Sequence, residues 1–488
     1  MLFRIKKVIY RVSIQFLLTF IFAVSGLTPL SASTPKKDYW PTENWRQSNP
    51  EAQGMDSGKL MRVIPFIIEN LPNIQSLLVV RNGYVVFENY YGPGMPDQQN
   101  TVHSVTKSIT SILAGIAKDE GLIGDLNQTL YDILPEYYDS TIDPAKKAIT
   151  LEHLLTMTAG LQPVRVKDGN LLMQWYFAQD CTKFSLDLPL IHPPGKKFAY
   201  SNPISHLISV IIIKKSGMNL SEFAERSLFK PLGIKSRIWK MDAKGNSTGH
   251  GGLYLSTRDM AKIGFLYLNN GYWAGKQIVS PGWVEESTRG HVMAGRDYAY
   301  GYQWWTRPVG GCPSYRAWGR NGQFIVVVPE LDLVVTVTSA TGLPGGPSGH
   351  YAPLFDIVAK SVIDKSCASS FPEEVVFSGE KNLPADLKKF FQGFSQAVEN
   401  KDIEEILDYY SDNFLNSGRD KPGLERFYRL LTTGIDKFSF KINQCRIKGN
   451  TATISGDIAT NMGPNTLSIT DLIKENGFWK WYGNQKSK

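Results

Sequence analysis

The segment HSVTKSIT (103–110) contains a serine and a lysine three positions apart, Ser104 and Lys107. Positions i and i+3 share one face of an α-helix, so the lysine amine can reach the serine hydroxyl. An uncharged amine could remove the serine proton, which requires the pKa of Lys107 to lie well below its usual value of about 10.4. Burial near a helix N-terminus and other cations lowers a lysine pKa in this way. The pair predicts an activated serine, and free N–H groups at the helix start would favour an oxyanion beside it.

The spacing alone is not specific. SxxK also occurs at Ser33, Ser227 and Ser378, but only Ser104 opens a long apolar helix. The alternative for Ser104 is an ordinary N-cap serine, whose hydroxyl binds the backbone of its own helix. The neighbouring His103 is a poorer base, because adjacent helical positions point apart.

A second polar element, HPPGKKFAYSN (192–202), is a loop that delivers Tyr200 and Asn202 just before an apolar segment. A phenol can relay a proton to a leaving group, and an amide can hold a substrate carbonyl. The alternative for Tyr200 is a core tyrosine with a satisfied hydroxyl. YxN also recurs at Tyr267 and Tyr482, so placement matters more than the letters.

Segments far apart in the chain must position these residues. SLLVV (76–80) and YVVFENYY (84–91) flank a tight turn, and FIVVVPELDLVVTVTS (324–339) predicts two further strands. Apolar residues at helical spacing predict the helices between them: 105–119, 151–157, 204–217 and 256–271, the last with Ser256 as its N-cap. Strands at both ends with helices between them predict an α/β sandwich whose sheet combines early and late chain.

The sequence pattern changes after about residue 370. A polar linker at 371–385 precedes a helix at 387–411 and strand-like segments at 437–460 and 478–485. This pattern predicts a small α+β domain at 386–488. A chain of 488 residues is also longer than one typical domain.

The first 33 residues are typical of an export signal. Basic residues come first, then an apolar run from Phe16 to Leu27, then small residues at 31–33. We expect cleavage and a periplasmic or secreted protein without a stable membrane span. A retained anchor is the alternative, although the apolar stretch is short for a span. No cysteine follows the signal, which excludes lipid attachment there.

Charge and cysteine content limit the partners. The net charge of +8 includes four basic residues of the signal, and the remainder is too small to predict nucleic-acid binding. The four cysteines allow three complete disulfide pairings, among which the sequence does not choose: Cys181, Cys312, Cys367 and Cys445. Neither the cysteines nor the histidines have metal-ligand spacing, so we expect no metal and no cofactor. No GxSxG elbow is present, which argues against an α/β-hydrolase.

Residues from about 45 to 365 resemble the serine β-lactamase-related hydrolases, which include class C β-lactamases, DD-peptidases, esterases and aminohexanoate-dimer hydrolases. Six blocks in the family's order carry the resemblance: SVTKS (104–108) with GIAKDEGLIGDL (115–126), ITLEHLLTMTAGL (149–161), PPGKKFAYSN (193–202), GGLYLSTRDMAKIG (251–264), GYQWW (301–305) and GRNGQFIVVVPELDLVVTVTS (319–339). The resemblance implies a β-lactamase/transpeptidase-like sandwich at 34–370, with an antiparallel sheet flanked by helices and an all-helical subdomain.

The resemblance also implies roles for the candidate residues. Ser104 would be the acylated nucleophile, Lys107 its general base and Tyr200 a second proton-transfer group. Asn202 would orient the substrate. The backbone N–H groups of Ser104 and Gln323 would form the oxyanion hole.

The third motif of the family departs from the usual pattern in this chain. The family has Lys or His, then a small residue, then Gly, whereas this chain has Arg320, Asn321 and Gly322. We expect these residues to bind substrate. Arg320 keeps the positive charge, but its planar guanidinium differs from an ammonium, so the motif does not predict recognition of a penicillin-type carboxylate.

Two further segments have two or more interpretations each. LLMQWYFAQDCTKF (171–184) predicts either a lid over an acyl group or a packed surface loop. VENKDIEEILDYYSDNF (398–414) and GLERFYRLL (423–431), with the following strands, resemble the SnoaL-like, nuclear-transport-factor-type cone. That resemblance implies small-ligand binding, an oligomer contact, or shaping of the substrate entrance.

These features together predict an exported serine hydrolase that acts through an acyl-enzyme on an amide, ester or β-lactam bond of a small molecule or short peptide. The alternative is a catalytically inactive penicillin-binding-like protein that binds peptidoglycan fragments or a protein partner. An intact set of Ser104, Lys107 and Tyr200 favours the enzyme.

Overall fold

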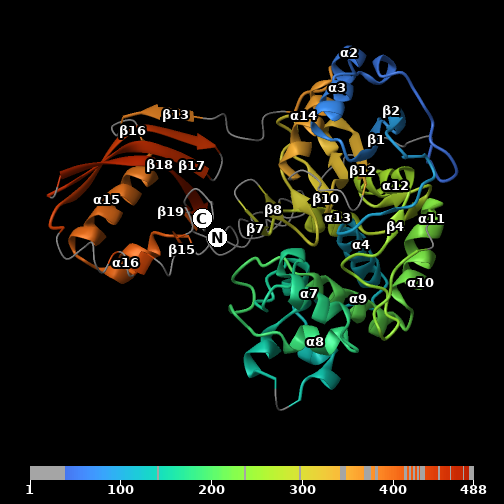
Figure 1. Ribbon diagram of the computed structural model, residues 1–488, viewed down its shortest axis with the longest axis horizontal. Coiled ribbons are helices and arrows are strands. Elements are labelled where there is room, and N and C mark those ends of the chain that lie inside the picture. Colours follow the sequence, from blue (N-terminus) through green and yellow to red (C-terminus); the bar gives the residue numbers. More distant parts are fainter. Residues whose placement is uncertain are drawn as a thin grey trace, which may run out of the picture. The chain divides into compact units, whose positions relative to one another are not determined.

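The computed structural model of the protein is drawn in Figure 1. It describes residues 39–139, 142–235, 238–295, 298–340 and 348–367 and, nearer the C-terminus, 375–379, 383–411, 415–416, 419–420, 424–425, 428, 435–448, 451–461, 463–475 and 478–482. The predicted export signal lies outside the described residues. Among the described helices, none is both long and apolar enough to cross a bilayer.

An antiparallel sheet of eight strands forms the centre of the larger region, in the order β2-β1-β12-β11-β10-β9-β8-β7. Its strands are β1 (Ile74–Arg81), β2 (Tyr84–Tyr90), β7 (Val292–Met293), β8 (Ala299–Tyr300), β9 (Trp305–Thr306), β10 (Tyr315–Gly319), β11 (Gln323–Val328) and β12 (Leu333–Ser339). The first strand pairs with the last, with Val79 opposite Val335. The predicted sheet that combines early and late chain is therefore confirmed.

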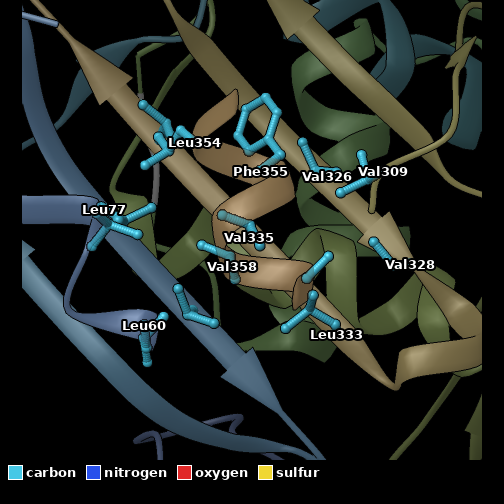
Figure 2. Packing of buried hydrophobic residues seen from close by; sticks show 14 of the residues in the cluster. Leu60, Leu77, Val309, Val326, Val328, Leu333, Val335, Leu354, Phe355 and Val358 are labelled. Carbon is cyan, nitrogen blue, oxygen red and sulfur yellow. The ribbon is translucent and has the colours of Figure 1, made fainter. Parts of the chain in front are cut away.

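One face of this sheet packs against helices from both ends of the region. These helices are α2 (Ser57–Leu60), α3 (Val63–Asn70) and α14 (Ala352–Lys360). Because side chains alternate along a strand, Leu333 and Val335 of β12 point to this face. There they join Phe355 and Val358 of α14 in one apolar core, with Leu60 and Leu77 at its side (Figure 2).

The other face carries the helices that position the candidate site. They are α4 (Val105–Asp119) and α12 (Thr257–Leu268), which contact β10, β11 and β12. Every residue of α4 from Val105 to Ala117 is buried. The predicted helix 105–119 matches α4, and the predicted N-cap of α12 is also present, because Ser256 accepts a hydrogen bond from Asp259 N.

Further helices complete the region, several of which Figure 1 labels. They are α5 (Leu130–Ile133), α6 (Leu151–Leu155), α7 (Gly169–Tyr176), α8 (Cys181–Asp187), α9 (Asn202–Ser216), α10 (Leu220–Ala224), α11 (Lys230–Leu232) and α13 (Pro281–Thr288). α9 begins two residues before the predicted start, since Pro203 fits the first turn of a helix. Its first eleven residues are buried, which makes it a central support for the loop that precedes it.

The C-terminal region has its own sheet, in the order β13-β16-β17-β18-β19. Its strands are β13 (Val375–Ser378), β16 (Phe438–Lys448), β17 (Thr451–Thr460), β18 (Gly463–Glu475) and β19 (Phe478–Trp481), and α15 (Ala385–Glu399) buries Phe390, Phe391 and Phe394. β13 lies inside the predicted linker and pairs with β16. The predicted single helix 387–411 is divided, because Lys401 has a φ of 60° and Asp402 caps a new helix, α16 (Ile403–Asp408).

The disulfide pairing left open by the sequence is partly resolved. Cys312 and Cys367 form a disulfide with a Cα–Cα distance of 5.3 Å. Cys181 and Cys445 are buried and unpaired, so the structure contains one bridge rather than a complete pairing of all four cysteines.

The contact between α12 and the sheet generates a prediction about stability. A Cβ at Gly264 would lie 2.5 Å from Val334 Cγ1 and 2.8 Å from Ile325 Cγ2. We expect Gly264→Val to destabilise the fold by about 1–3 kcal/mol, because overpacking exceeds the gain in helix propensity. Thermal unfolding measures the effect. Gly124→Val is the matched control, since nothing lies within 4 Å of a Cβ there; equal midpoints for the two variants would contradict close packing of α12.

Candidate active site

The turn before α4 presents Ser104. Val102 N donates to Leu253 O, and His103 has a φ of 48°, which directs the chain sharply into the helix. The side chain of Ser104 makes no N-cap hydrogen bond to the backbone of α4. Its hydroxyl instead accepts a hydrogen bond from Lys107 Nζ at 3.2 Å. The Ser104 side chain is therefore not an ordinary N-cap, and it remains the candidate nucleophile.

Lys107 lies in a dry environment of uncharged acceptors. Its side-chain nitrogen donates to Ser104 Oγ and, at 2.9 Å each, to Asn202 Oδ1 and His250 O. The residue is 1% exposed. Burial favours the neutral amine and lowers the pKa of Lys107 to about 7. A substantial fraction of this lysine is therefore uncharged at neutral pH.

Tyr200 reaches the same point from the loop before α9. Ala199 N donates to Met157 O and Asn202 N donates to Val164 O, which fixes the loop on both sides of the tyrosine. Lys107 Nζ lies 4.9 Å from the centre of the Tyr200 ring. Burial raises the pKa of Tyr200, and a hydrogen bond with Ser104 opposes that shift. Tyr200 is thus a neutral phenol in contact with the candidate nucleophile.

The turn between β10 and β11 approaches the site through Gly319. A Cβ at Gly319 would lie 2.3 Å from Val102 O, two residues before Ser104. The next residue, Arg320, is exposed. Burial of His103 is the main cause that lowers the pKa of this histidine to about 4, and the positive charge of Arg320 lowers it further. The positive charge of the third motif therefore lies beside the turn that presents Ser104.

The rest of the third motif packs against Tyr351. Asn321 and Gly322 have φ values of 64° and 95° and form the tight turn. A Cβ at Gly322 would lie 2.1 Å from Tyr351 Oη, so this glycine is required by packing against the tyrosine. The hydroxyl of Tyr351 also donates to Asn321 O at 3.4 Å.

Gln323 begins β11 and is 0% exposed. Its amide is occupied by the backbone of Ser339: Nε2 donates to Ser339 O at 2.7 Å, and Oε1 accepts from Ser339 N at 3.3 Å. Its side chain is therefore structural. The expected role of its N–H in an oxyanion hole stays a prediction.

Two residues of the site were not identified from the sequence. One is His250, whose backbone carbonyl accepts a hydrogen bond from Lys107 Nζ. Gln303, inside the GYQWW block, accepts from Ser108 through its carbonyl and from Ser205 through its side chain, at 2.7 Å each. Its amide also donates to Leu154 O and Leu155 O. Gln303 thus joins α4, α6 and α9. The GYQWW block could have indicated Gln303, whereas a backbone carbonyl such as that of His250 has no sequence signal.

Within the described ranges, no group of three or more His, Cys, Asp or Glu side chains could hold a metal ion. Ser104 contacts an amine and a phenol, and the amine of Lys107 also contacts an amide and a backbone carbonyl. Such a set can move a proton from a hydroxyl and return it to another atom.

The close approach at Gly319 generates a prediction about Ser104. In Gly319→Ala, the new Cβ must displace Val102 and the turn that presents the hydroxyl. We expect labelling of Ser104 by a fluorophosphonate to slow by about tenfold or more, because small misplacements of a reacting atom are costly. Gly282→Ala, with nothing within 4 Å of its Cβ, is the control. Wild-type labelling and an unchanged melting temperature in Gly319→Ala would show that the contact is unimportant.

The sequence and the fold of this chain are similar to those of several known proteins. The 6-aminohexanoate-dimer hydrolase of Paenarthrobacter ureafaciens is 25% identical over 298 residues, which are 54% of this chain and 72% of that protein. The structure of a putative 6-aminohexanoate-dimer hydrolase from Bacillus anthracis superposes with a TM-score of 0.53 at 21% identity, covering 61% of this chain and 80% of that one. An octameric penicillin-binding protein homologue from Pyrococcus abyssi has a TM-score of 0.52 at 19% identity, covering 88% and 95%.

The two structures have the same fold as this chain. The Beta-lactamase family matches residues 75–354, a segment that contains Ser104, Lys107 and Tyr200 and more than half of the chain. The chain therefore belongs to the Beta-lactamase family.

Proposed function

We propose that the protein is a serine hydrolase that acts through an acyl-enzyme, with Ser104 as nucleophile, Lys107 as general base and Tyr200 as proton relay. The observation that carries the proposal is the position of Lys107 Nζ, 3.2 Å from Ser104 Oγ and held by two other uncharged oxygens. Membership of the Beta-lactamase family and the relative named as a hydrolase support it.

The acylation step uses the neutral form of Lys107. Ser104 Oγ attacks the substrate carbonyl carbon and forms the new C–O bond while its proton passes to Lys107 Nζ. The carbonyl π electrons move to oxygen and give a tetrahedral oxyanion. A base with a pKa of about 7 suits this step, since it is available near neutral pH and can still accept the proton.

The later steps return the proton. Collapse of the oxyanion breaks the bond to the leaving group, which takes a proton from Tyr200 Oη as the phenol recovers one from Lys107. Water then attacks the acyl-serine, and the same groups work in the opposite direction to release the acid. The interaction of Tyr200 with Ser104, which opposes the effect of burial on the pKa of the phenol, supports this transfer.

The oxyanion hole requires N–H groups that face the substrate oxygen. Ser104 N, at the start of α4, is one donor in this proposal. The second comes from the turn between β10 and β11, where the sequence indicates Gln323. Gln323 is 0% exposed. Arg320 is exposed and directly follows Gly319, which packs closely against Val102 O. Arg320 N is therefore the alternative donor in the same turn.

The remaining residues of the predicted site would bind substrate. Asn202 Oδ1 is engaged by Lys107, which leaves its Nδ2 as a donor for a substrate carbonyl. The exposed guanidinium of Arg320 can face a polar or anionic group, and Asn321 and Gly322 hold the turn that carries it. The substrate would be an amide, ester or lactam of a small molecule or short peptide.

The wider setting is proposed from several features. The predicted signal at 1–33 and the Cys312–Cys367 bridge fit an exported protein, because disulfides persist in oxidising compartments. The C-terminal region would act as a SnoaL-like accessory domain for ligand or oligomer contacts. A catalytically inactive, peptidoglycan-binding protein is the alternative, and the lowered pKa of Lys107 favours the enzyme.

Covalent labelling separates these two functions. We expect an alkyl fluorophosphonate to add one phosphonyl group to the wild type in intact-protein mass spectrometry, and none to Ser104→Ala. Tyr200→Phe should retain labelling but lose about 10²–10⁴-fold in ester turnover, since proton transfer contributes that much. A folded wild type that neither labels nor hydrolyses any ester, amide or lactam would favour the inactive binding protein.

The lowered pKa of Lys107 sets the pH dependence. A lysine whose pKa falls to about 7 is protonated and inactive below that pH and neutral above it. We therefore expect kcat/KM for p-nitrophenyl acetate to rise with pH to a plateau, with an apparent pKa of about 7. Lys107→Arg, which stays charged, should be inactive throughout this range. A profile that continues to rise towards pH 10 would contradict Lys107 as the neutral base.

A further inference from the structure

α7 exposes an apolar face next to the candidate site. Met173, Tyr176 and Phe177 stand at i, i+3 and i+4, and they are 48%, 43% and 77% exposed. The opposite side of the helix is buried through Leu172 and Trp175. Single exposed apolar residues are ordinary, whereas these three lie together on the last turn of α7 and its C-cap, Phe177.

Two contacts tie this face to the reacting groups. Tyr176 Oη lies 3.2 Å from His250 Nε2, and the carbonyl of His250 accepts from Lys107 Nζ. Trp175, next to Tyr176, packs edge-to-face against the His250 ring, with centroids 4.8 Å apart. Trp175 is fixed in turn by donating to Ser185 Oγ at 3.0 Å. α7 is thus anchored through His250, on the side of Lys107.

Tyr200 marks another side of the site. Its ring packs against Trp305 at a centroid distance of 5.7 Å, and Trp305 packs against Trp318 at 5.2 Å. The proposed chemistry requires the leaving group to lie beside the phenol that protonates it. The group on the other side of the scissile carbonyl must therefore extend away from Tyr200.

We propose that Met173, Tyr176 and Phe177 form the subsite for an uncharged, apolar acyl chain or aryl group attached to the scissile carbonyl. This inference rests on the proposed function and names its substrate class. The segment 171–184, expected to be a lid or a surface loop, instead forms most of α7 and the start of α8, and in this proposal the exposed face of α7 covers the acyl group. This face selects apolar acyl groups, because contact between the two removes both the acyl chain of the substrate and the exposed side chains of the face from water.

An acyl-length series tests the subsite with one leaving group held constant. The full chain is assayed with p-nitrophenyl acetate, butyrate and octanoate, and the readout is the ratio of kcat/KM for octanoate to that for acetate. We expect the double variant Met173→Ser/Phe177→Ser to lower this ratio by about tenfold or more, because each methylene in an apolar pocket is worth that order of discrimination. Met173→Leu/Phe177→Leu should keep most of it.

The controls separate the alternatives. Ile68→Ser removes an exposed apolar side chain of α3 that is 71% exposed, and it should leave the ratio unchanged. An unchanged ratio in the serine double variant overturns the inference while ester turnover by the wild type upholds the proposed function. The inference is also overturned if the serine double variant changes kcat/KM with the length of the alcohol in alkyl acetates and not with the length of the acyl chain. It is overturned as well if the variant alters only self-association or binding to vesicles. Absence of Ser104 labelling in the wild type would remove both.

Discussion

The arrangement of the candidate site depends on the burial of one amine, that of Lys107. Burial is unfavourable for the charged form of a lysine, and the three acceptors that Lys107 Nζ contacts in the described part of the chain are neutral oxygens. The burial of α4 from Val105 to Ala117 supplies this environment. The cost of burial falls on the protonated amine, and in the proposed mechanism this makes the neutral amine available as the base.

The remaining architecture brings three distant segments to that amine. The eight-stranded sheet supports α4 from one side, and β10 ends with Gly319 against Val102 O. α9 begins at Asn202, which binds the amine directly. Gln303 ties α4, α6 and α9 together beneath them. These contacts hold the groups of the proposed proton transfer, and Tyr176 of α7 contacts His250 beside them.

The sequence predicted the elements with strong local signals. Apolar periodicity identified α4, and spacing plus loop composition identified Ser104, Lys107, Tyr200 and Asn202, which the structure brings together. Features set by tertiary contact were missed. The carbonyl of His250 has no side-chain signature, and the break at Lys401 depends on a positive φ at a residue that suits a helix. The burial of Gln323 follows from its bonds to Ser339, sixteen residues later in the chain.

The most direct measurement is the side-chain titration of Lys107 in the intact protein. Nitrogen-15 NMR of lysine-labelled protein, with the signal assigned by its loss in Lys107→Met, follows the amine from the charged to the neutral form. The account predicts a midpoint at about pH 7, because burial lowers the pKa of this lysine. A midpoint near the ordinary lysine value of about 10.4 would contradict it, since no base would then remain beside Ser104 at neutral pH.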